Sequence, residues 1–116
     1  MKKYLMAFAL IGLVPAALSA DALLSPKTTI KRVFTYKTAA VIELSDAMKK
    51  DSGCTYSKSG KYIALRFSDA GAKEMYSSIL SAYVAGLKIK MGTKGCDPIW
   101  SGDGTMNKIY RVTLEK

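Results

Sequence analysis

Apolar and polar residues alternate with a period of two along five short stretches of the chain, a pattern typical of half-buried β-strands. The clearest stretch is 62–67, in which large apolar residues occupy every second position. In the first stretch we expect Ile30, Phe34 and Tyr36 to share the buried face. The predicted strands are 29–36, 39–44, 62–67, 87–91 and 108–114.

The spacing of apolar residues becomes helical between the third and fourth predicted strands. Ser68 or Asp69 can cap a helix there, and Gly86 is typical of a helix end. We expect residues 21–28 to be a tether, with loops at 45–60 (including a helical turn over 46–50) and 92–107. The order β-β-β-α-β-β matches the OB-type barrel. We therefore predict a mainly β fold with one α-helix, a five-stranded OB-fold-like barrel made by residues 21–116 as one domain.

The first twenty residues have the layout of a secretory signal peptide. Lys2 and Lys3 precede an apolar run over 5–18, and small residues follow as far as Ala20. The run is short for a membrane span, and no second apolar segment follows it. We expect cleavage after Ala20, with Ala20-Asp21-Ala22 as an alternative motif and a retained N-terminal anchor as the alternative interpretation. The predicted location is secreted or periplasmic, without a stable membrane span.

The chain contains two cysteines, Cys54 and Cys96. In an oxidising compartment such a pair indicates a disulfide. A metal site or a redox pair is the alternative, but the chain has no histidine and no Cys-x-x-Cys motif. Closing so long a loop stabilises a fold by roughly 4 kcal/mol in the chain-entropy model.

Basic residues outnumber acidic ones by 18 to 9. Loss of Lys2 and Lys3 with the signal peptide leaves 16 basic residues and a net charge of +7. This balance favours polyanionic partners or serves solubility alone. A candidate basic face for a polyanion or a single-stranded nucleic acid is formed by Arg32, Arg66, Lys88, Lys90 and Arg111. Export argues against nucleic acid as the main ligand.

The predicted helix carries no charged residue from Met75 to Leu87. A lone surface helix normally has lysines and glutamates on its outer face. Here that face has small side chains, which let another backbone approach closely, or it is an ordinary exposed serine-rich face. The candidate oligomer interface is Ser77, Ser78, Ser81 and Ala85.

Two loop clusters have the composition of a sugar-binding site, which combines an aromatic ring with polar groups that bind hydroxyls. The candidate ligand-binding residues are Trp100 with Asp97, Ser101 and Asp103, and Tyr56 with Lys58 and Ser59. The alternatives are that Trp100 covers one end of the barrel and that Tyr56 is partly buried beside the disulfide.

The sequence gives catalysis little support. A serine or cysteine nucleophile needs a nearby base, most often a histidine, and the chain has none. The glycine-rich segment 92–105 lacks the GxxxxGK[ST] pattern of a phosphate-binding loop. Asp97 and Asp103 lack the spacing of an EF-hand. We therefore expect a non-enzymatic binding protein with no cofactor and no metal.

The segment FSDAGAKEMYSSILSAYVAGLKIKMGTKGC, which lies between two predicted strands, resembles the B subunits of bacterial AB5 toxins. The subtilase-cytotoxin and pertussis-like branch is the most similar, over roughly residues 60–114. The resemblance implies an oligomeric, ring-forming OB-fold subunit that binds a host glycan and accompanies a secreted enzymatic A-type subunit. It identifies no binding residue. The alternatives are a monomeric periplasmic inhibitor or assembly factor that binds a protein, and a polyanion binder.

Overall fold

The computed structural model describes residues 22–48, 53–56, 58 and 60–115. The predicted signal peptide over 1–20, the candidate residue Ser59 and the end of the predicted turn at 46–50 lie outside these residues.

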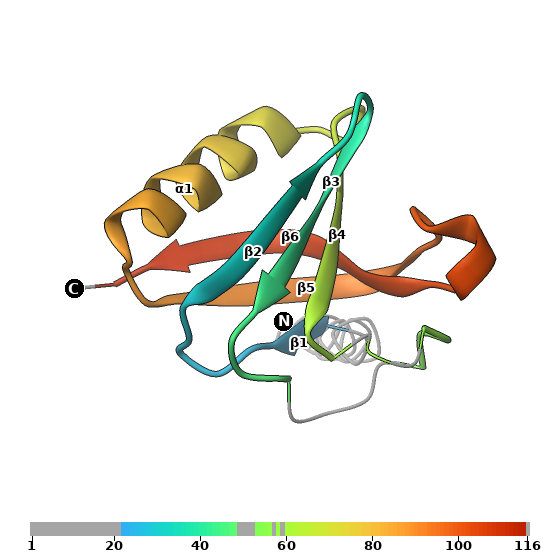
Figure 1. Ribbon diagram of the computed structural model, residues 1–116, viewed down its shortest axis with the longest axis horizontal. Coiled ribbons are helices and arrows are strands. Elements are labelled where there is room, and N and C mark those ends of the chain that lie inside the picture. Colours follow the sequence, from blue (N-terminus) through green and yellow to red (C-terminus); the bar gives the residue numbers. More distant parts are fainter. Residues whose placement is uncertain (1–21, 49–52, 57, 59, 116) are drawn as a thin grey trace, which may run out of the picture.

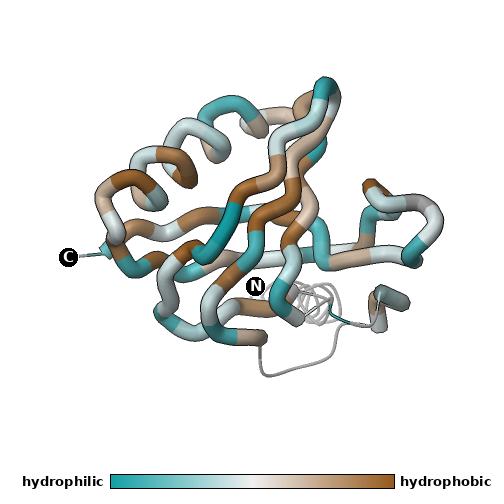
Figure 2. The backbone as a smooth tube through the Cα atoms, viewed as in Figure 1, coloured by the Kyte–Doolittle hydropathy of each residue, from teal (hydrophilic) through white to brown (hydrophobic). Residues whose placement is uncertain are grey.

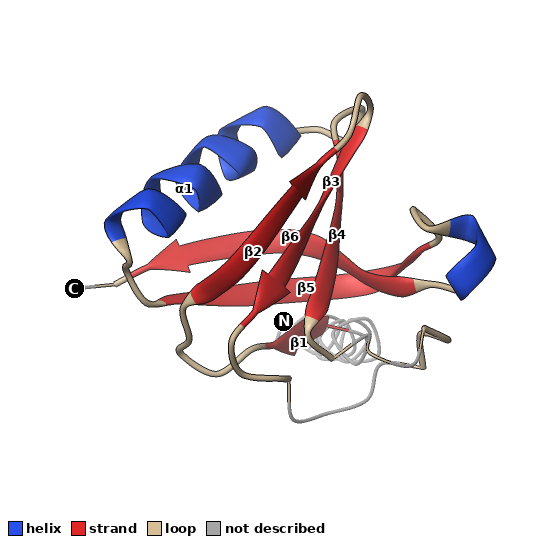
Figure 3. Cartoon of the chain, viewed as in Figure 1, coloured by secondary structure: helices blue, strands red, loops and turns tan. Residues whose placement is uncertain are grey.

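In the described part of the chain, six strands form one sheet, with a single α-helix inserted between the fourth and fifth strands (Figures 1 and 3). The strand order is β1-β5-β6-β4-β3-β2, and every neighbouring pair is antiparallel except β4 and β6, which are parallel. The elements are β1 (Ala22–Leu24), β2 (Ile30–Thr35), β3 (Ala39–Leu44), β4 (Tyr62–Arg66), α1 (Ala72–Ala85), β5 (Ile89–Asp97), the 3-10 turn η2 (Ser101–Asp103) and β6 (Met106–Leu114).

The mainly β class with one helix is confirmed, but the prediction of a closed five-stranded barrel is wrong. The sheet has six strands, and β1 and β2 are its two edges. The sixth strand arises because the chain before β2 pairs with β5 instead of forming a tether. Thr28 and Ile89 then exchange both backbone hydrogen bonds, at 2.9 and 2.7 Å.

Ser25 continues the pairing of the N-terminal segment with β5 next to Pro26, which has no N–H group to donate. The Ser25 N–H donates to the Met91 carbonyl, and the Met91 N–H donates to the Ser25 hydroxyl, both at 2.8 Å. The Ser25 hydroxyl thus takes the place of a main-chain carbonyl as the acceptor. This occurs where the chain leaves β5 and turns toward β3.

Helix α1 lies across one face of the sheet and buries the main hydrophobic core against it (Figure 1). Figure 2 shows hydrophobic residues along the central strands and on turns of the helix. Ile79 and Ala82 of α1 are fully buried, as are Ile42 of β3 and Leu65 of β4. The predicted alternation in the second and third strands is therefore confirmed, since these positions face the helix.

The predicted helix end is confirmed, while the predicted capping residues are wrong. Gly86 follows α1 in the left-handed conformation (φ 69°), and the Leu87 N–H closes the end on the Ala82 carbonyl. At the other end Gly71 precedes the helix without a side-chain cap. Asp69 lies in the turn before it, and its carboxylate forms an ion pair with Lys108.

A register shift between Ile30 and Arg32 alters the predicted faces of β2. The extra residue puts Val33 with the core under α1, whereas Phe34 packs on the opposite face of the sheet. The expectation that Ile30 and Phe34 share a face is therefore wrong, because a bulge interrupts the alternation between them.

The predicted disulfide is present between Cys54 and Cys96, whose Cα atoms lie 5.6 Å apart. It joins the segment before β4 to the end of β5. The predicted loop over 92–107 is much shorter than expected, because β5 extends to Asp97 and β6 begins at Met106.

Candidate functional site

The face of the sheet opposite α1 carries a second, smaller core. Val41, Ala64 and Met106 are fully buried there, beneath side chains from two strands and two connecting segments. The residues that cover them are Phe34, Tyr56, Tyr62, Ile99 and Trp100. We call Phe34, Tyr56, Tyr62 and Trp100 the aromatic cluster.

Trp100 lies at the centre of the aromatic cluster, on the face of the sheet rather than across one of its ends. Its ring centroid lies 5.3 Å from that of Phe34, 5.6 Å from that of Tyr62 and 5.8 Å from that of Tyr56. The contacts with Phe34 and Tyr56 are edge-to-face, an arrangement that aromatic rings prefer. The indole N–H donates a 2.8 Å hydrogen bond to the Tyr36 hydroxyl.

The two segments that carry Tyr56 and Trp100 are bound to each other beside the disulfide. The Thr55 N–H donates to the Thr105 hydroxyl at 2.9 Å, and the Thr105 N–H donates to the Thr55 hydroxyl at 2.8 Å. The Tyr56 N–H also donates to the Thr105 carbonyl at 2.7 Å. Gly104 permits this close approach, since a Cβ atom there would lie 2.6 Å from the Thr55 hydroxyl oxygen.

A pocket of about 210 Å³ lies between the β2–β3 turn and the segment that follows β5. Trp100 and Ile99 line one side, and Tyr36, Thr38, Ala39 and Arg66 complete the lining. We call this the tryptophan pocket. It offers an indole, a phenolic hydroxyl and a guanidinium group within one concave surface.

Asp97 holds Arg66 in the tryptophan pocket. The Arg66 Nε donates to both carboxylate oxygens at 3.0 and 3.1 Å, and a terminal nitrogen donates at 2.8 Å. The pKa of Arg66 is raised, mainly because of these hydrogen bonds. Asp97 itself is 5% exposed, so the group it presents to the pocket is the oriented guanidinium.

A larger open groove of about 550 Å³ lies on the same face of the sheet. Four of its lining residues are cationic and one is acidic, and we call it the basic groove. It is lined by Lys31, Arg32, Glu43, Ala47, Lys58, Gly60, Lys61 and Tyr62.

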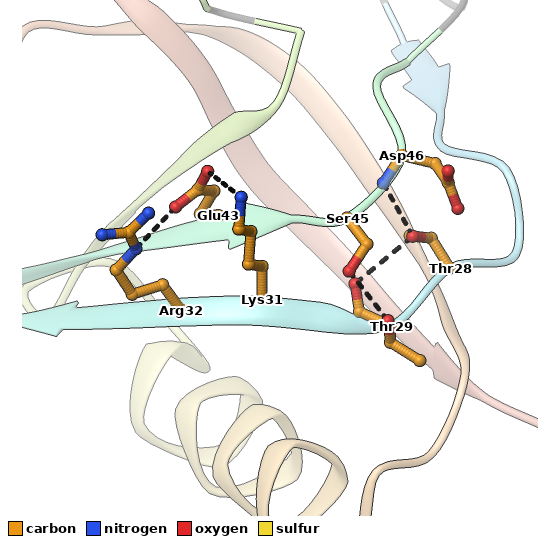
Figure 4. A network of polar contacts seen from close by, with 7 residues as sticks. All are labelled: Thr28, Thr29, Lys31, Arg32, Glu43, Ser45 and Asp46. Carbon is orange, nitrogen blue, oxygen red and sulfur yellow. Dashed lines mark hydrogen bonds and ion pairs between the residues drawn. The ribbon is translucent and has the colours of Figure 1, made fainter.

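Glu43 organises the floor of the basic groove from near the end of β3. It lies opposite Arg32 in one neighbouring strand and opposite Tyr62 in the other. Arg32 Nε donates to the Glu43 carboxylate at 2.8 Å, and Lys31 Nζ lies 3.9 Å from it, as Figure 4 shows. Burial is the main cause that raises the pKa of Tyr62, and the charge of Glu43 adds to it.

A second group of polar contacts fixes the chain beside the groove (Figure 4). The hydroxyls of Thr29 and Ser45 form a 2.8 Å hydrogen bond, and the Asp46 N–H donates to the Thr28 hydroxyl at 3.0 Å. These bonds join the start of β2 to the turn after β3. They therefore support the strand pair that carries Lys31, Arg32 and Glu43.

The structure brings together some of the sequence-predicted ligand residues and separates others. Trp100 and Tyr56 are in contact, and Lys58 lies in the basic groove. Asp103 is exposed in η2, which begins at Ser101. Sequence reasoning did not select Tyr36, Thr38 and Ile99 of the tryptophan pocket, or Lys31 and Lys61 of the groove.

The predicted basic residues lie in different surroundings. Arg32 is in the basic groove, Arg66 is in the tryptophan pocket, and Lys90 lies 3.9 Å from Glu115. Lys88 and Arg111 are exposed, and neither has an ion-pair partner in the described part of the chain.

The outer face of α1 is exposed at Ser77, Ser81 and Ala85, while Ser78 is half-buried. Val84 lies beside these residues on the helix and is 84% exposed. This face therefore combines small side chains with one prominent apolar residue.

Among residues 22–48, 53–56, 58 and 60–115, no three His, Cys, Asp or Glu side chains gather as a metal site would require. The helical segments of the same residues include none with the length and apolar character of a membrane span. A comparison with models of known protein families finds no match, and neither does a search of curated proteins.

Proposed function

We propose that this protein is an exported, non-enzymatic carbohydrate-binding subunit, and that a sugar binds in the tryptophan pocket. The observation that supports this most is the juxtaposition of Trp100, the Tyr36 hydroxyl and the Asp97-oriented Arg66. Sugar sites combine an aromatic surface with a few fixed polar groups, and this pocket offers both.

The connectivity supports the same site. Strands β2, β3, β4, β5 and β6, with α1 between β4 and β5, follow the element order of an OB-type barrel. We infer that the sheet is such a barrel in partly open form, with the bent segment 22–35 spanning β5 and β3. Oligosaccharides bind OB folds at the loops after the first and fourth strands, which correspond here to 36–38 and 98–105. Both segments line the tryptophan pocket.

Trp100 makes a direct test possible, because it is the only tryptophan in the chain. The exported protein is screened on a glycan array, and each hit is titrated while the indole emission is recorded. A sugar bound in the pocket shifts the emission along with binding.

The matched variants are Trp100→Phe and Tyr110→Phe. Trp100→Phe keeps an aromatic ring in the cluster, and we expect it to weaken binding by about tenfold, or about 1.4 kcal/mol. Tyr110 is exposed on β6 and does not line the pocket, so its variant should bind as the parent does. The proposal fails if no glycan is retained, or if binding leaves both the emission and the Trp100→Phe affinity unchanged.

The resemblance to toxin B subunits extends this proposal to a homo-oligomer that accompanies a secreted enzymatic partner. The exposed, uncharged face of α1 at Ser77, Ser81 and Ala85 supports it as the contact between copies. Light scattering of the parent and of Ser81→Arg tests this. We expect a ring-sized mass that falls to that of a monomer in the variant, with an unchanged circular dichroism spectrum. A monomeric parent contradicts the assembly but leaves the sugar site standing.

A further inference from the structure

The basic groove carries an excess of positive charge that the carboxylate in its lining does not neutralise. The lining contains four cations and one carboxylate, that of Glu43, so it has three positive charges in excess. The cations are Lys31, Arg32, Lys58 and Lys61. Lys31 and Arg32 are each within 4 Å of Glu43. In the described part of the chain, Lys58 and Lys61 have no ion-pair partner.

Glu43 acts as a support for the cations rather than as a competitor of an anion. Its side chain is 6% exposed, whereas those of Lys31 and Arg32 are 56% and 54% exposed. The carboxylate accepts a hydrogen bond from Arg32 Nε, which leaves the terminal guanidinium nitrogens to donate to an anion. The Tyr62 side chain also lies next to Glu43 in the sheet, and the charge of Glu43 helps to raise the pKa of Tyr62.

The groove and the tryptophan pocket lie on the same face along β4. Tyr62 lines the groove and Arg66 lines the pocket, so the two sites are about 13 Å apart along this strand. A single extended chain can therefore contact both. The aromatic cluster lies between them.

We infer that the basic groove binds closely spaced sulfate groups of a sulfated polysaccharide whose neighbouring sugar occupies the tryptophan pocket. This rests on the proposed sugar site and names the class of its ligand. Exposed lysines and an oriented guanidinium suit sulfate oxygens, which accept charge-assisted hydrogen bonds. The volume of about 550 Å³ also exceeds what a single sulfate ion would need.

The surroundings of the groove favour a polysaccharide over other polyanions. Single-stranded nucleic acid binds through bases stacked on free aromatic faces. Among the residues that line the groove, Tyr62 alone is aromatic, so the groove has no row of rings on which successive bases could stack. An anionic membrane surface is bound with apolar side chains beside the cations, and none of the exposed large hydrophobic residues of the described chain lines the groove.

The experiment titrates the full exported protein with a heparin-derived octasaccharide at fixed ionic strength. The same octasaccharide without its sulfates retains the backbone and the carboxylates, and is the matched ligand. Vesicles containing anionic phospholipid and a single-stranded oligonucleotide are the competing polyanions. We expect tight binding of the sulfated chain only, with an affinity that falls as salt is raised.

The variants compare two equal losses of charge. Lys58→Gln/Lys61→Gln removes the free lysines of the groove, and Lys73→Gln/Lys94→Gln removes two exposed lysines on α1 and β5. We expect the groove variant to lose at least about tenfold in affinity, equivalent to about 1.4 kcal/mol, and the control less than twofold. Equal losses in both variants would overturn the inference, because general electrostatic attraction would then explain the binding.

The remaining outcomes separate this inference from the proposed function. Binding of the desulfated chain as tightly as the sulfated one, with a shift in Trp100 emission, overturns the sulfate site alone. Sulfate-dependent binding that needs Lys58 and Lys61 but leaves the emission unchanged supports the groove and contradicts the tryptophan pocket. Preference for the vesicles or the oligonucleotide overturns the polysaccharide as the ligand.

Discussion

Single residues fix the geometry of the face of the sheet opposite α1. Gly104 adopts φ 101° and packs against Thr55 where the two covering segments meet. Tyr62 pairs with Glu43 across the β3–β4 ladder while its ring packs in the aromatic cluster. Each of these residues has a role that a chemically similar side chain would not reproduce.

Gly104→Ala should destabilise the fold by about 2 kcal/mol, because it combines a positive φ with a steric overlap. The added Cβ would lie 2.6 Å from the Thr55 hydroxyl oxygen and 3.1 Å from the Tyr56 nitrogen. Gly102→Ala is the matched control. A Cβ there meets nothing within 4 Å, and the φ of Gly102 lies outside the positive range that L side chains rarely adopt. Urea unfolding measures both, and equal stability of the two variants would contradict the packing described at Gly104.

Tyr62 should make stability depend on pH in the alkaline range. Its pKa is raised in the folded state, mainly by burial, so the folded protein holds this proton more tightly than the unfolded chain. Stability from this residue is complete below the ordinary tyrosine pKa of about 10 and is lost as pH rises through the raised value. Thermal unfolding of the parent and of Tyr62→Phe between pH 8 and 11 should show a steeper decline for the parent. Parallel declines would contradict the assignment.

Secondary structure elements divide into those that the sequence predicts and those that need a distant partner. The strand at 39–44 and the helix end at Gly86 were predictable, because alternation and a terminal glycine are local signals. Strand β1 and the second half of β5 were not, since both depend on pairing with segments far along the chain.

The segment 92–97 shows why the sequence predicted a loop where the structure has a strand. Its two glycines are typical of a loop, yet both serve the sheet. Gly92 lies against Arg111, where a Cβ would be only 3.3 Å from the arginine Cβ. Gly95 adopts φ 82° within the second register shift of the β5–β6 ladder, between Thr93 and Cys96. Likewise, the composition of the loops was enough to select Trp100 and Tyr56. Tyr36 and Ile99 could not be selected in this way, because only the fold brings the β2–β3 turn next to the segment after β5.

Helix α1 offers a test of its two faces. Ile79→Ala should cost about 2–5 kcal/mol, because the side chain is fully buried against the sheet. Val84→Ala should change the stability of the monomer by less than about 0.5 kcal/mol, since this residue is 84% exposed. Chemical denaturation checks both. A large loss for Val84→Ala that disappears on dilution would instead show that this side chain is buried between copies.

At the scale of the whole molecule, the disulfide constrains the segments that cover the face of the sheet opposite α1. It joins Cys54 and Cys96 across 42 residues that include β4 and α1. The two segments it joins carry Tyr56 and lead to Trp100.

Replacing both cysteines by alanine should lower the free energy of unfolding by about 4 kcal/mol, the chain-entropy value for a loop of this length. Differential scanning calorimetry of the parent and the double variant measures the loss. Reducing agent should destabilise the parent and leave the variant unchanged. An unchanged melting temperature in the double variant would contradict a stabilising role for the bond.

The pairing of β1 with β5 has a consequence for how the chain acquires its structure. Leu23 lies opposite Thr93, so the first strand has no partner until nearly the whole chain is available. Contacts of such large sequence separation form late and slow folding, because they close long loops. Export of the unfolded chain would therefore interrupt little folding, because β1 cannot pair with β5 until most of the chain is present. Hydrogen exchange should find the amides of Ser25 and Thr28 the first in the sheet to open and the last to become protected.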